Sequence, residues 1–254
     1  MNTELIENGY RVVGAINAPD EIQALQEEIY GRIQTYLTPH DETLPLVERL
    51  SLPFDKPISI SEWGKFSKAV ENSDAMRALS TAPAVYDVFR EIFHGPPQLH
   101  PICRFRARIP GLNATEYGWH QDHGIIYTHK HPTISDRLAS ALWISLNGAE
   151  KGTGIQLIPG SHHGRLRRHK FKKGQGAFGG VFDSELEQQP PFEFEAPVGH
   201  GILFHPLIIH RTSPGTIQKP RFSVDIRYFD PEGDDRINVE FRFRVERALK
   251  RLIP

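Results

Sequence analysis

The sequence predicts a mainly β protein, a sandwich or barrel of short strands preceded by a segment of helices. Before Pro97 apolar residues recur at spacings of three and four, as on one face of a helix, whereas after it they alternate with polar residues, as in strands. Clusters of Gly, Pro and Ser separate the later segments, which is typical of all-β folds rather than of βαβ units. In 254 residues we expect a single domain, with a mainly helical part (1–97), a β core (98–230) and a C-terminal extension (231–254).

Two long helices are predicted in the first part. One extends from Pro19 to Tyr36, because its apolar residues form one stripe and its first turn holds proline and acidic residues. The other runs from about Pro83 to His94 and is stopped by a Gly-Pro-Pro sequence. Residues 40–80 are expected to form short helices and loops.

Six strands are predicted in the core, at residues 100–109, 138–146, 154–158, 192–195, 201–209 and 222–229. The first alternates Arg104, Arg106 and Arg108 with apolar residues. We interpret this arginine side as a solvated outer face, with the apolar side in the core. In the alternative interpretation the arginines face the barrel mouth, where Arg106 would bind an anionic substrate, and the apolar side packs on the N-terminal helices.

Composition excludes several classes of protein. The formal net charge of −1 gives no overall field that would attract nucleic acid or an anionic membrane. The single cysteine, Cys103, can form neither an internal disulfide nor a thiolate metal site, which fits a reducing compartment. The N-terminus lacks a signal-peptide pattern, and no apolar stretch approaches the length of a membrane span. We therefore expect a cytoplasmic protein that binds no nucleic acid and no membrane.

The most informative motif is Trp119-His120-Gln121-Asp122, followed far downstream by His210 and, eleven positions later, by Arg221. Residues i and i+2 of an extended strand point to the same side, so His120 and Asp122 can approach one metal ion. His210 follows a nearly apolar segment that antiparallel pairing would place beside the first strand. Two histidines and one carboxylate are the ligand set of non-haem Fe(II) sites, and the arginine suggests a co-substrate that carries a carboxylate.

A His-x-Asp pair is weak evidence by itself, because the chain has 13 histidines and 31 acidic residues. The evidence for a metal site comes from the complete set of motifs and their order along the chain. His205 also lies near the apolar segment, but an arginine eleven residues after the ligand favours His210.

The ordered set resembles the phytanoyl-CoA dioxygenase family, whose members are Fe(II)/2-oxoglutarate oxygenases. The motifs that carry the resemblance are Trp119-His120-Gln121-Asp122, Ala141-Leu142-Trp143-Ile144, Leu157-Ile158-Pro159-Gly160-Ser161-His162, Gly201 to His210 and Arg221-Phe222-Ser223. The likeness covers roughly residues 98 to 230. It implies a double-stranded β-helix, that is, a jelly-roll or cupin-like barrel, with the N-terminal helices packed as a layer on one sheet.

The resemblance also implies residue roles. It makes His120, Asp122 and His210 the iron ligands. It makes Arg221 the partner of the distal carboxylate of 2-oxoglutarate, with Ser223 adding a hydroxyl donor. This role is chemically sound, since a guanidinium binds a carboxylate through a fixed two-bond fork.

Further residues are expected around the same site. By the same similarity Gln121 and Trp143 would line the space for the co-substrate or the substrate. Tyr117 and Tyr127 flank the motif and could shape the substrate pocket, as could His123 in the predicted loop that follows. Aromatic core packing is an equally good explanation for the two tyrosines.

The predicted function is oxidation of a C–H bond of a small organic metabolite, with Fe(II), 2-oxoglutarate and O2, and with decarboxylation of 2-oxoglutarate to succinate and CO2. Two alternatives are a cupin-like protein that binds metal or ligand, and a metal-dependent hydrolase or isomerase. Arg221-x-Ser223 favours the oxygenase, because neither alternative needs an anchor for a dicarboxylate. The chain ends without a peroxisomal signal, and the sequence leaves open monomer or homodimer, the substrate, and whether the loop 174–191 is a lid.

Overall fold

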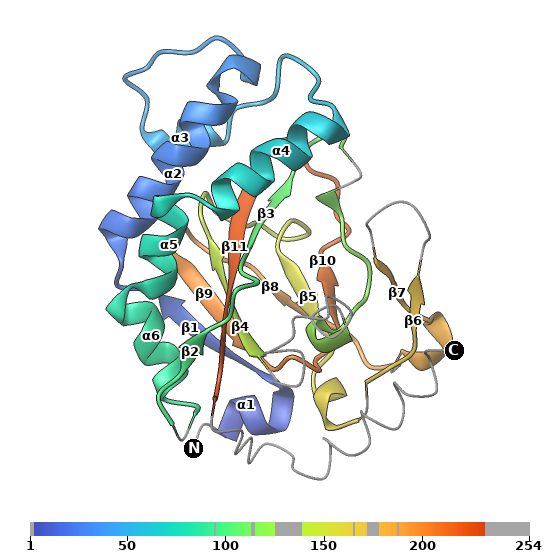
Figure 1. Ribbon diagram of the computed structural model, residues 1–254. Helices are drawn as coiled ribbons and strands as arrows, with labels where there is room; N and C mark the ends of the chain where they lie inside the picture. Colours follow the sequence, from blue (N-terminus) through green and yellow to red (C-terminus); the bar gives the residue numbers. More distant parts are fainter. Residues whose placement is uncertain are drawn as a thin grey trace.

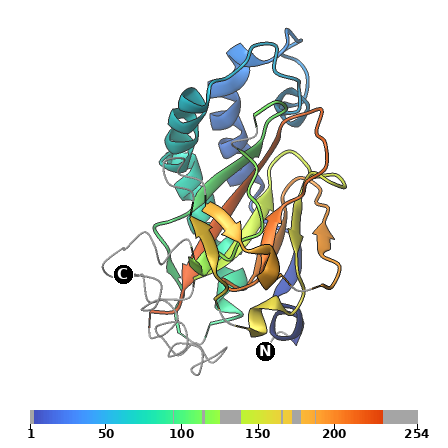
Figure 2. The same ribbon diagram turned by 90° about the vertical axis from the view of Figure 1, so that its right-hand side faces the viewer.

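The structure is a computed structural model that describes residues 3–93, 95–112, 115–124, 139–164, 166–171, 178–186 and 188–231. Tyr127 and nearly all of the predicted C-terminal extension lie outside these residues. Within them, helices cover one face of a large antiparallel sheet, and a smaller sheet faces the other side (Figures 1 and 2). The structure therefore has the jelly-roll arrangement that was predicted.

Within the described residues, the α-helices of five or more residues all belong to the N-terminal part of the chain. They are α1 (Thr3–Asn8), α2 (Pro19–Ile33), α3 (Leu46–Leu50), α4 (Ile60–Glu71), α5 (Asp74–Thr81) and α6 (Pro83–Arg90), with a 3-10 turn at Gln34–Tyr36. α2 begins at a proline with two acidic residues in its first turn, as predicted. α6 ends at Arg90, four residues before the predicted end. α4 opens with a capping box in which Ser59 and Glu62 satisfy each other's backbone N–H groups.

The strands of the large sheet are β1 (Tyr10–Ala15), β2 (Gln98–Leu99), β3 (Arg104–Arg108), β4 (Ala139–Ser145), β9 (His200–Phe204) and β11 (Arg221–Phe229). Their order is β1-β9-β4-β11-β2, and β3 also pairs with β11. The small sheet has the order β10-β5-β8, with β5 (Ile155–Leu157), β8 (Phe192–Phe194) and β10 (His210–Thr212). A hairpin of β6 (His169–Phe171) and β7 (Phe178–Val181) completes the described strands.

One hydrophobic cluster joins the helices to the large sheet. Phe105 on β3 packs against Trp63 and Phe66 of α4, with ring centroids 5.9 and 5.6 Å apart, and stacks on Phe222 of β11. The cluster continues from Leu5 to Tyr228 through residues of every major helix. We propose that helices and barrel form the single domain expected from the sequence, and this continuous core supports it.

Three predicted elements differ from the structure. The part predicted to be mainly helical contains β1, an edge strand that pairs with β9 through Tyr10, Arg11 and Val12 and, after a register shift, through Gly14 and Ala15. The strand predicted at 201–209 is wrong in its second half, because β9 ends at Phe204 and the chain turns at Pro206, which has no N–H to donate to a ladder. The predicted loop 174–191 contains β7 and a 3-10 turn at Asp183–Glu185.

None of the described helices has both the length and the apolar character needed to cross a membrane.

Candidate active site

Backbone pairing brings the two halves of the predicted metal site together. His120 forms an isolated antiparallel bridge with His210, in which each backbone N–H donates to the other's carbonyl at 2.9 Å. Asp122 does not lie on an extended strand, as was predicted, but at the start of helical backbone in residues 122–124. The chain turns there because the N–H groups of His123 and Gly124 donate to Pro206 and Gln121.

The three predicted ligands nevertheless converge. One ligand atom from each of His120, Asp122 and His210 lies within 4.8 Å of the others, and all three residues are buried. Oδ1 of Asp122 is 3.8 Å from Nε2 of His120 and 3.7 Å from Nε2 of His210. Nδ1 of each histidine contacts a backbone carbonyl, of Gly118 at 2.8 Å and of Ile208 at 3.1 Å. Because a carbonyl only accepts, Nδ1 carries the proton and Nε2 keeps its lone pair for a metal.

This arrangement fits a divalent metal ion. Nε2 of His120 and Oδ1 of Asp122 are buried and have no hydrogen-bond partner among the described residues. Buried polar atoms without partners are costly, so a cation that bonds both atoms would remove the cost. Imidazole and carboxylate together suit non-haem Fe(II).

The charge state of the site also suits metal binding. Burial, reinforced by the neighbouring His210, holds the pKa of His120 well below its usual value, and burial likewise lowers the pKa of His210. Burial by itself would raise the pKa of Asp122, but the positive charge of Arg227 lowers it below its ordinary range. Two neutral imidazoles and one carboxylate are the protonation states that ligate.

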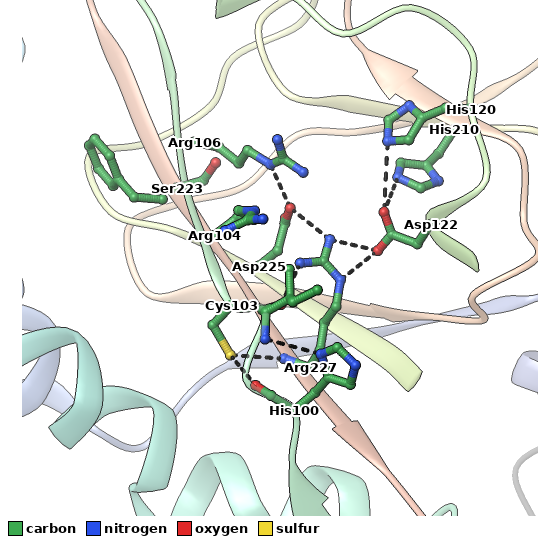
Figure 3. A network of polar contacts seen from close by, with 12 residues as sticks. His100, Cys103, Arg104, Arg106, His120, Asp122, His210, Ser223, Asp225 and Arg227 are labelled. Atoms are coloured by element: carbon green, nitrogen blue, oxygen red, sulfur yellow. Dashed lines mark hydrogen bonds and ion pairs between the residues drawn. The ribbon is translucent and has the colours of Figure 1, made fainter. Parts of the chain in front are cut away.

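A chain of ion pairs leads away from Asp122 along the inner face of the large sheet (Figure 3). Nε of Arg227 donates to Oδ2 of Asp122 at 2.8 Å. The NH2 group of Arg227 lies 3.2 Å from Oδ2 of Asp225, which also accepts from Nε of Arg106 at 2.7 Å. The interior is therefore charged on this side, and its charges alternate in sign.

Arg221 lies in the same pocket as the two histidines. The residues that line this pocket are Arg106, Ala107, Thr115, Tyr117, His120, Trp143, Gly154, Ile155, His210, Arg211, Thr212, Arg221 and Asp225. Arg221 donates to the carbonyl of Thr153 at 2.9 Å and to Oγ of Ser223 at 2.6 Å, and its guanidinium lies 5.6 Å from the ring centre of Trp143. Burial and repulsion from Arg108 lower its pKa to about 9, and no carboxylate of the described residues pairs with it. This arginine is available to an anionic ligand.

The preferred interpretation of the arginine strand was wrong for Arg106 and Arg108, which lie on the interior side as in the alternative interpretation, whereas the anionic substrate assigned to Arg106 stays a prediction. Arg108 is 2% exposed, and the Arg106 side chain lines the pocket rather than an outer surface. The apolar side of β3 packs on the helices, and Arg106 and Arg108 lie on the opposite, interior side, whereas Arg104 is only half-buried and pairs with Glu71 of α4. Ion pairs make this burial possible: Arg108 pairs with Glu116 at 2.8 Å, and Arg106 pairs with Asp225. Arg106 also lies 4.3 Å above the ring of Tyr117.

Two other predicted residues are placed differently from expectation. The side chain of Gln121 donates to the carbonyl of Leu207 and accepts from the N–H of Arg167, both at 2.6 Å. Its amide therefore joins the metal-site segment to the backbone instead of lining the pocket. His123 is buried, and neither it nor Gln121 is a lining residue of the described pocket.

Sequence reasoning missed Asp225 and Arg227. The signal was present in β11, where polar residues occupy alternate positions from Arg221 onward, as they do in the arginine strand. Two neighbouring strands, β3 and β11, whose inward polar residues have opposite charges indicate a buried ion-pair network.

Comparison with known proteins agrees with this geometry. The family model for phytanoyl-CoA dioxygenase (PhyH) matches residues 5–223. The chain belongs to the phytanoyl-CoA dioxygenase family. Human peroxisomal phytanoyl-CoA dioxygenase is 25% identical over 255 residues, which cover 92% of this chain and 71% of the human protein. The rat protein is 22% identical over 263 residues, 96% of this chain and 74% of its own length.

Solved structures show the same fold at lower identity. The epimerase SnoN, in complex with Fe3+, alpha-ketoglutarate and nogalamycin RO, gives a TM-score of 0.59 at 17% identity, over 90% of this chain and 81% of SnoN. The non-heme monooxygenase ThoJ gives 0.58 at 18% identity, over 90% and 76%. As a member of the PhyH family, the protein is an Fe(II)/2-oxoglutarate-dependent oxygenase that uses O2. Membership of this family favours the oxygenase over the two alternatives, a metal- or ligand-binding protein and a metal-dependent hydrolase or isomerase.

Proposed function

We propose that this PhyH enzyme oxidises a C–H bond of a small organic substrate in the pocket where His120, Asp122 and His210 converge. The observation that carries the proposal is the set of three buried ligand atoms within 4.8 Å of one another, beside a buried arginine that has no described carboxylate partner. The histidines and the carboxylate would hold Fe(II). Iron bound together with 2-oxoglutarate supplies O2-dependent oxidation of the substrate, with release of succinate and CO2.

Arg221 and Ser223 would bind and orient the co-substrate. The guanidinium is held by the carbonyl of Thr153 through Nε and by the Ser223 hydroxyl through NH1, so its position is fixed before a ligand arrives. Its NH2 group and the serine hydroxyl hydrogen remain to donate to a carboxylate. Trp143 and Ile155 would exclude water from the same pocket, since both are buried and line it.

The first experiment is an anaerobic titration of the metal-free protein with Fe(II) and then 2-oxoglutarate, recording the visible charge-transfer band of the iron–2-oxoglutarate chelate. We expect the band in the wild type and its loss in His120→Ala. Metal binding without the band would contradict the co-substrate assignment, and absence of metal binding would contradict the ligand set.

We also propose that the substrate carries an anionic group that Arg106 binds. Four arginines, Arg106, Arg211, Arg221 and Arg227, lie around the site against two carboxylates, Asp122 and Asp225, which leaves an excess of positive charge. Fe(II) and the 2-oxoglutarate dianion cancel each other, so the excess persists. The hydrogen bond from Arg106 to Asp225 uses Nε and leaves both terminal nitrogens for a further acceptor.

Substrate-stimulated succinate release tests this charge preference. The panel holds carboxylates, phosphate esters and their neutral analogues, and includes acyl-CoA thioesters because the relatives' name specifies phytanoyl-CoA. We expect turnover with anionic members, and for Arg106→Met a KM raised about 10-fold with unchanged 2-oxoglutarate affinity. Turnover confined to neutral members, or an unchanged KM, would remove the assignment.

We further propose a cytoplasmic enzyme that is a monomer or a homodimer. The single cysteine, which fits a reducing compartment, supports this location. Sedimentation equilibrium measures the oligomeric state, and a mass above that of a dimer would contradict the proposal.

A further inference from the structure

We infer that Arg227 is a positioning residue, which holds Asp122 so that only Oδ1 is presented to the metal. The inference rests on the proposed function, since it takes Asp122 as a ligand. It assigns a role to the ion-pair network that the sequence did not reveal (Figure 3).

The two oxygens of Asp122 have different surroundings. Oδ2 accepts from Nε of Arg227 at 2.8 Å and lies 2.6 Å from its NH2 group. Two nitrogens of the guanidinium therefore contact this one oxygen. Oδ1 has no hydrogen-bond partner among the described residues and lies within 4 Å of Nε2 of both histidines. One oxygen is occupied by the protein and the other faces the ligand set.

Arg227 itself is held on every side. Its side chain is 3% exposed, its NH1 group donates to the carbonyl of Ile102 at 3.0 Å, and its NH2 group also reaches Asp225. Asp225 is fixed in turn by Arg106, across the register that pairs β11 with β3. The guanidinium cannot turn away from Asp122 without breaking several of these bonds together, so its orientation is built into the sheet.

An arginine is suited to this task and a lysine is not. The planar guanidinium directs its nitrogens to Asp122, Asp225 and the Ile102 carbonyl in fixed directions, whereas an ammonium group is a point charge on a flexible stem. Groups that orient a metal ligand commonly change metal affinity by about 10- to 100-fold when they are removed. With Oδ2 engaged, the protein offers three ligand atoms; with Oδ2 released, it offers four.

The test uses Co(II), whose visible absorption reports the number of ligands. The metal-free protein is titrated anaerobically with Co(II) as wild type, Arg227→Met and Arg227→Lys. We expect affinity to fall at least about 10-fold in Arg227→Met. The intensity and position of the Co(II) bands should change in both variants, because Oδ2 becomes free to coordinate. A general loss of stability would not produce a new spectrum in folded protein.

Arg104→Met is the matched control. Arg104 lies on the same sheet and pairs with Glu71 at 3.3 Å, without contact to Asp122. This variant should keep the wild-type affinity and spectrum. If folded Arg227→Met or Arg227→Lys has the affinity and spectrum of the wild type, the inference about Arg227 is wrong. If the wild type itself does not bind Co(II), the assignment of His120, Asp122 and His210 as ligands is wrong.

Asp225→Asn keeps the test decisive if the Arg227 variants do not fold. The substitution keeps the bonds between Arg227 and Asp122 and weakens the carboxylate anchor that holds Arg227. We expect a spectral change in the same direction as in Arg227→Met but smaller, and a smaller loss of affinity. A spectrum and affinity identical to wild type would contradict the inference.

Discussion

The two faces of β11 carry opposite chemistry within nine consecutive buried residues. The side chains toward the helices are Phe222, Val224, Ile226 and Tyr228, and those toward the barrel interior are Arg221, Ser223, Asp225 and Arg227. The helix side is stabilised by removal of apolar surface from water. The interior side hydrogen-bonds its charges to one another and leaves specific atoms for ligands. Stability and chemistry are thus assigned to alternate residues, and substitutions should separate them.

The largest effect is expected on the helix side, from Phe222→Ala. Phe222 is fully buried and stacks on Phe105, so truncation leaves a cavity that should cost about 3–5 kcal/mol of the free energy of unfolding. Urea denaturation measures this loss. In the folded protein the affinity for 2-oxoglutarate should stay as in wild type, and a parallel loss of that affinity would break the separation of the two faces.

On the interior side, Arg221→Ala should weaken 2-oxoglutarate binding about 100-fold, or about 2.7 kcal/mol, because the dicarboxylate loses its charged fork. Stability should not fall, since Arg221 is buried without a described carboxylate partner and its removal relieves repulsion from Arg108. Calorimetric titration of the metal-loaded protein and urea denaturation measure the two quantities. Arg221→Lys, which keeps the charge without the fork, should recover only part of the affinity.

The 3-10 turn Ser161–His163, outside both faces of β11, should contribute to the pH dependence of stability. Burial, with the nearby His163, lowers the pKa of His162 to about 4, while its Nε2–H donates to the Ile6 carbonyl at 2.9 Å. Below pH 6.5 the unfolded chain binds a proton at His162 that the folded protein does not bind, so the contribution of His162 to stability should fall as pH drops from 6.5 to about 4 and then stay constant.

Replacing this histidine by glutamine should remove about 1–2 kcal/mol of that fall, after allowance for solvent screening. Urea denaturation across this pH range measures it. The exposed neighbour provides a comparison as His163→Gln, which should change the slope less than His162→Gln does, because repulsion from His163 is a smaller cause of the lowered pKa than burial. An unchanged slope in His162→Gln would place the pH dependence elsewhere.

The smallest effect is expected from Ser223→Ala. The hydroxyl accepts from Arg221 at 2.6 Å and is fully buried, so its loss should reduce 2-oxoglutarate affinity by about 1 kcal/mol, or about 5-fold. The same calorimetric titration applies. An effect as large as that of Arg221→Ala would show that serine, rather than arginine, dominates recognition.

Sequence periodicity was sufficient for much of the fold. The helix from Pro19 and the strands β4 and β11 were predicted close to their ends, because each has a strong apolar pattern of one period. β1 was missed since an edge strand of six residues among helices gives little pattern. The break between β9 and β10 was missed because the apolar run continues through the turn at Pro206.

At the site, the order of motifs was sufficient to predict which residues meet. The local geometry was not, since Asp122 was expected on a strand and lies in a helical turn. Arg106 lines the pocket but was predicted to face solvent. Alternation of polar and apolar residues along one strand defines two faces, but it does not show which face lies inside the protein.

The sequence by itself determined the fold class, the family and the three residues that converge, because these depend on patterns within single segments and on the order of motifs. The tertiary structure alone decided which face of β3 is interior, which oxygen of Asp122 is free, and that Arg106, Asp225 and Arg227 form one network with it. The physical reason is that burial and charge pairing depend on the strands and helices that pack on each face, and these come from distant parts of the chain.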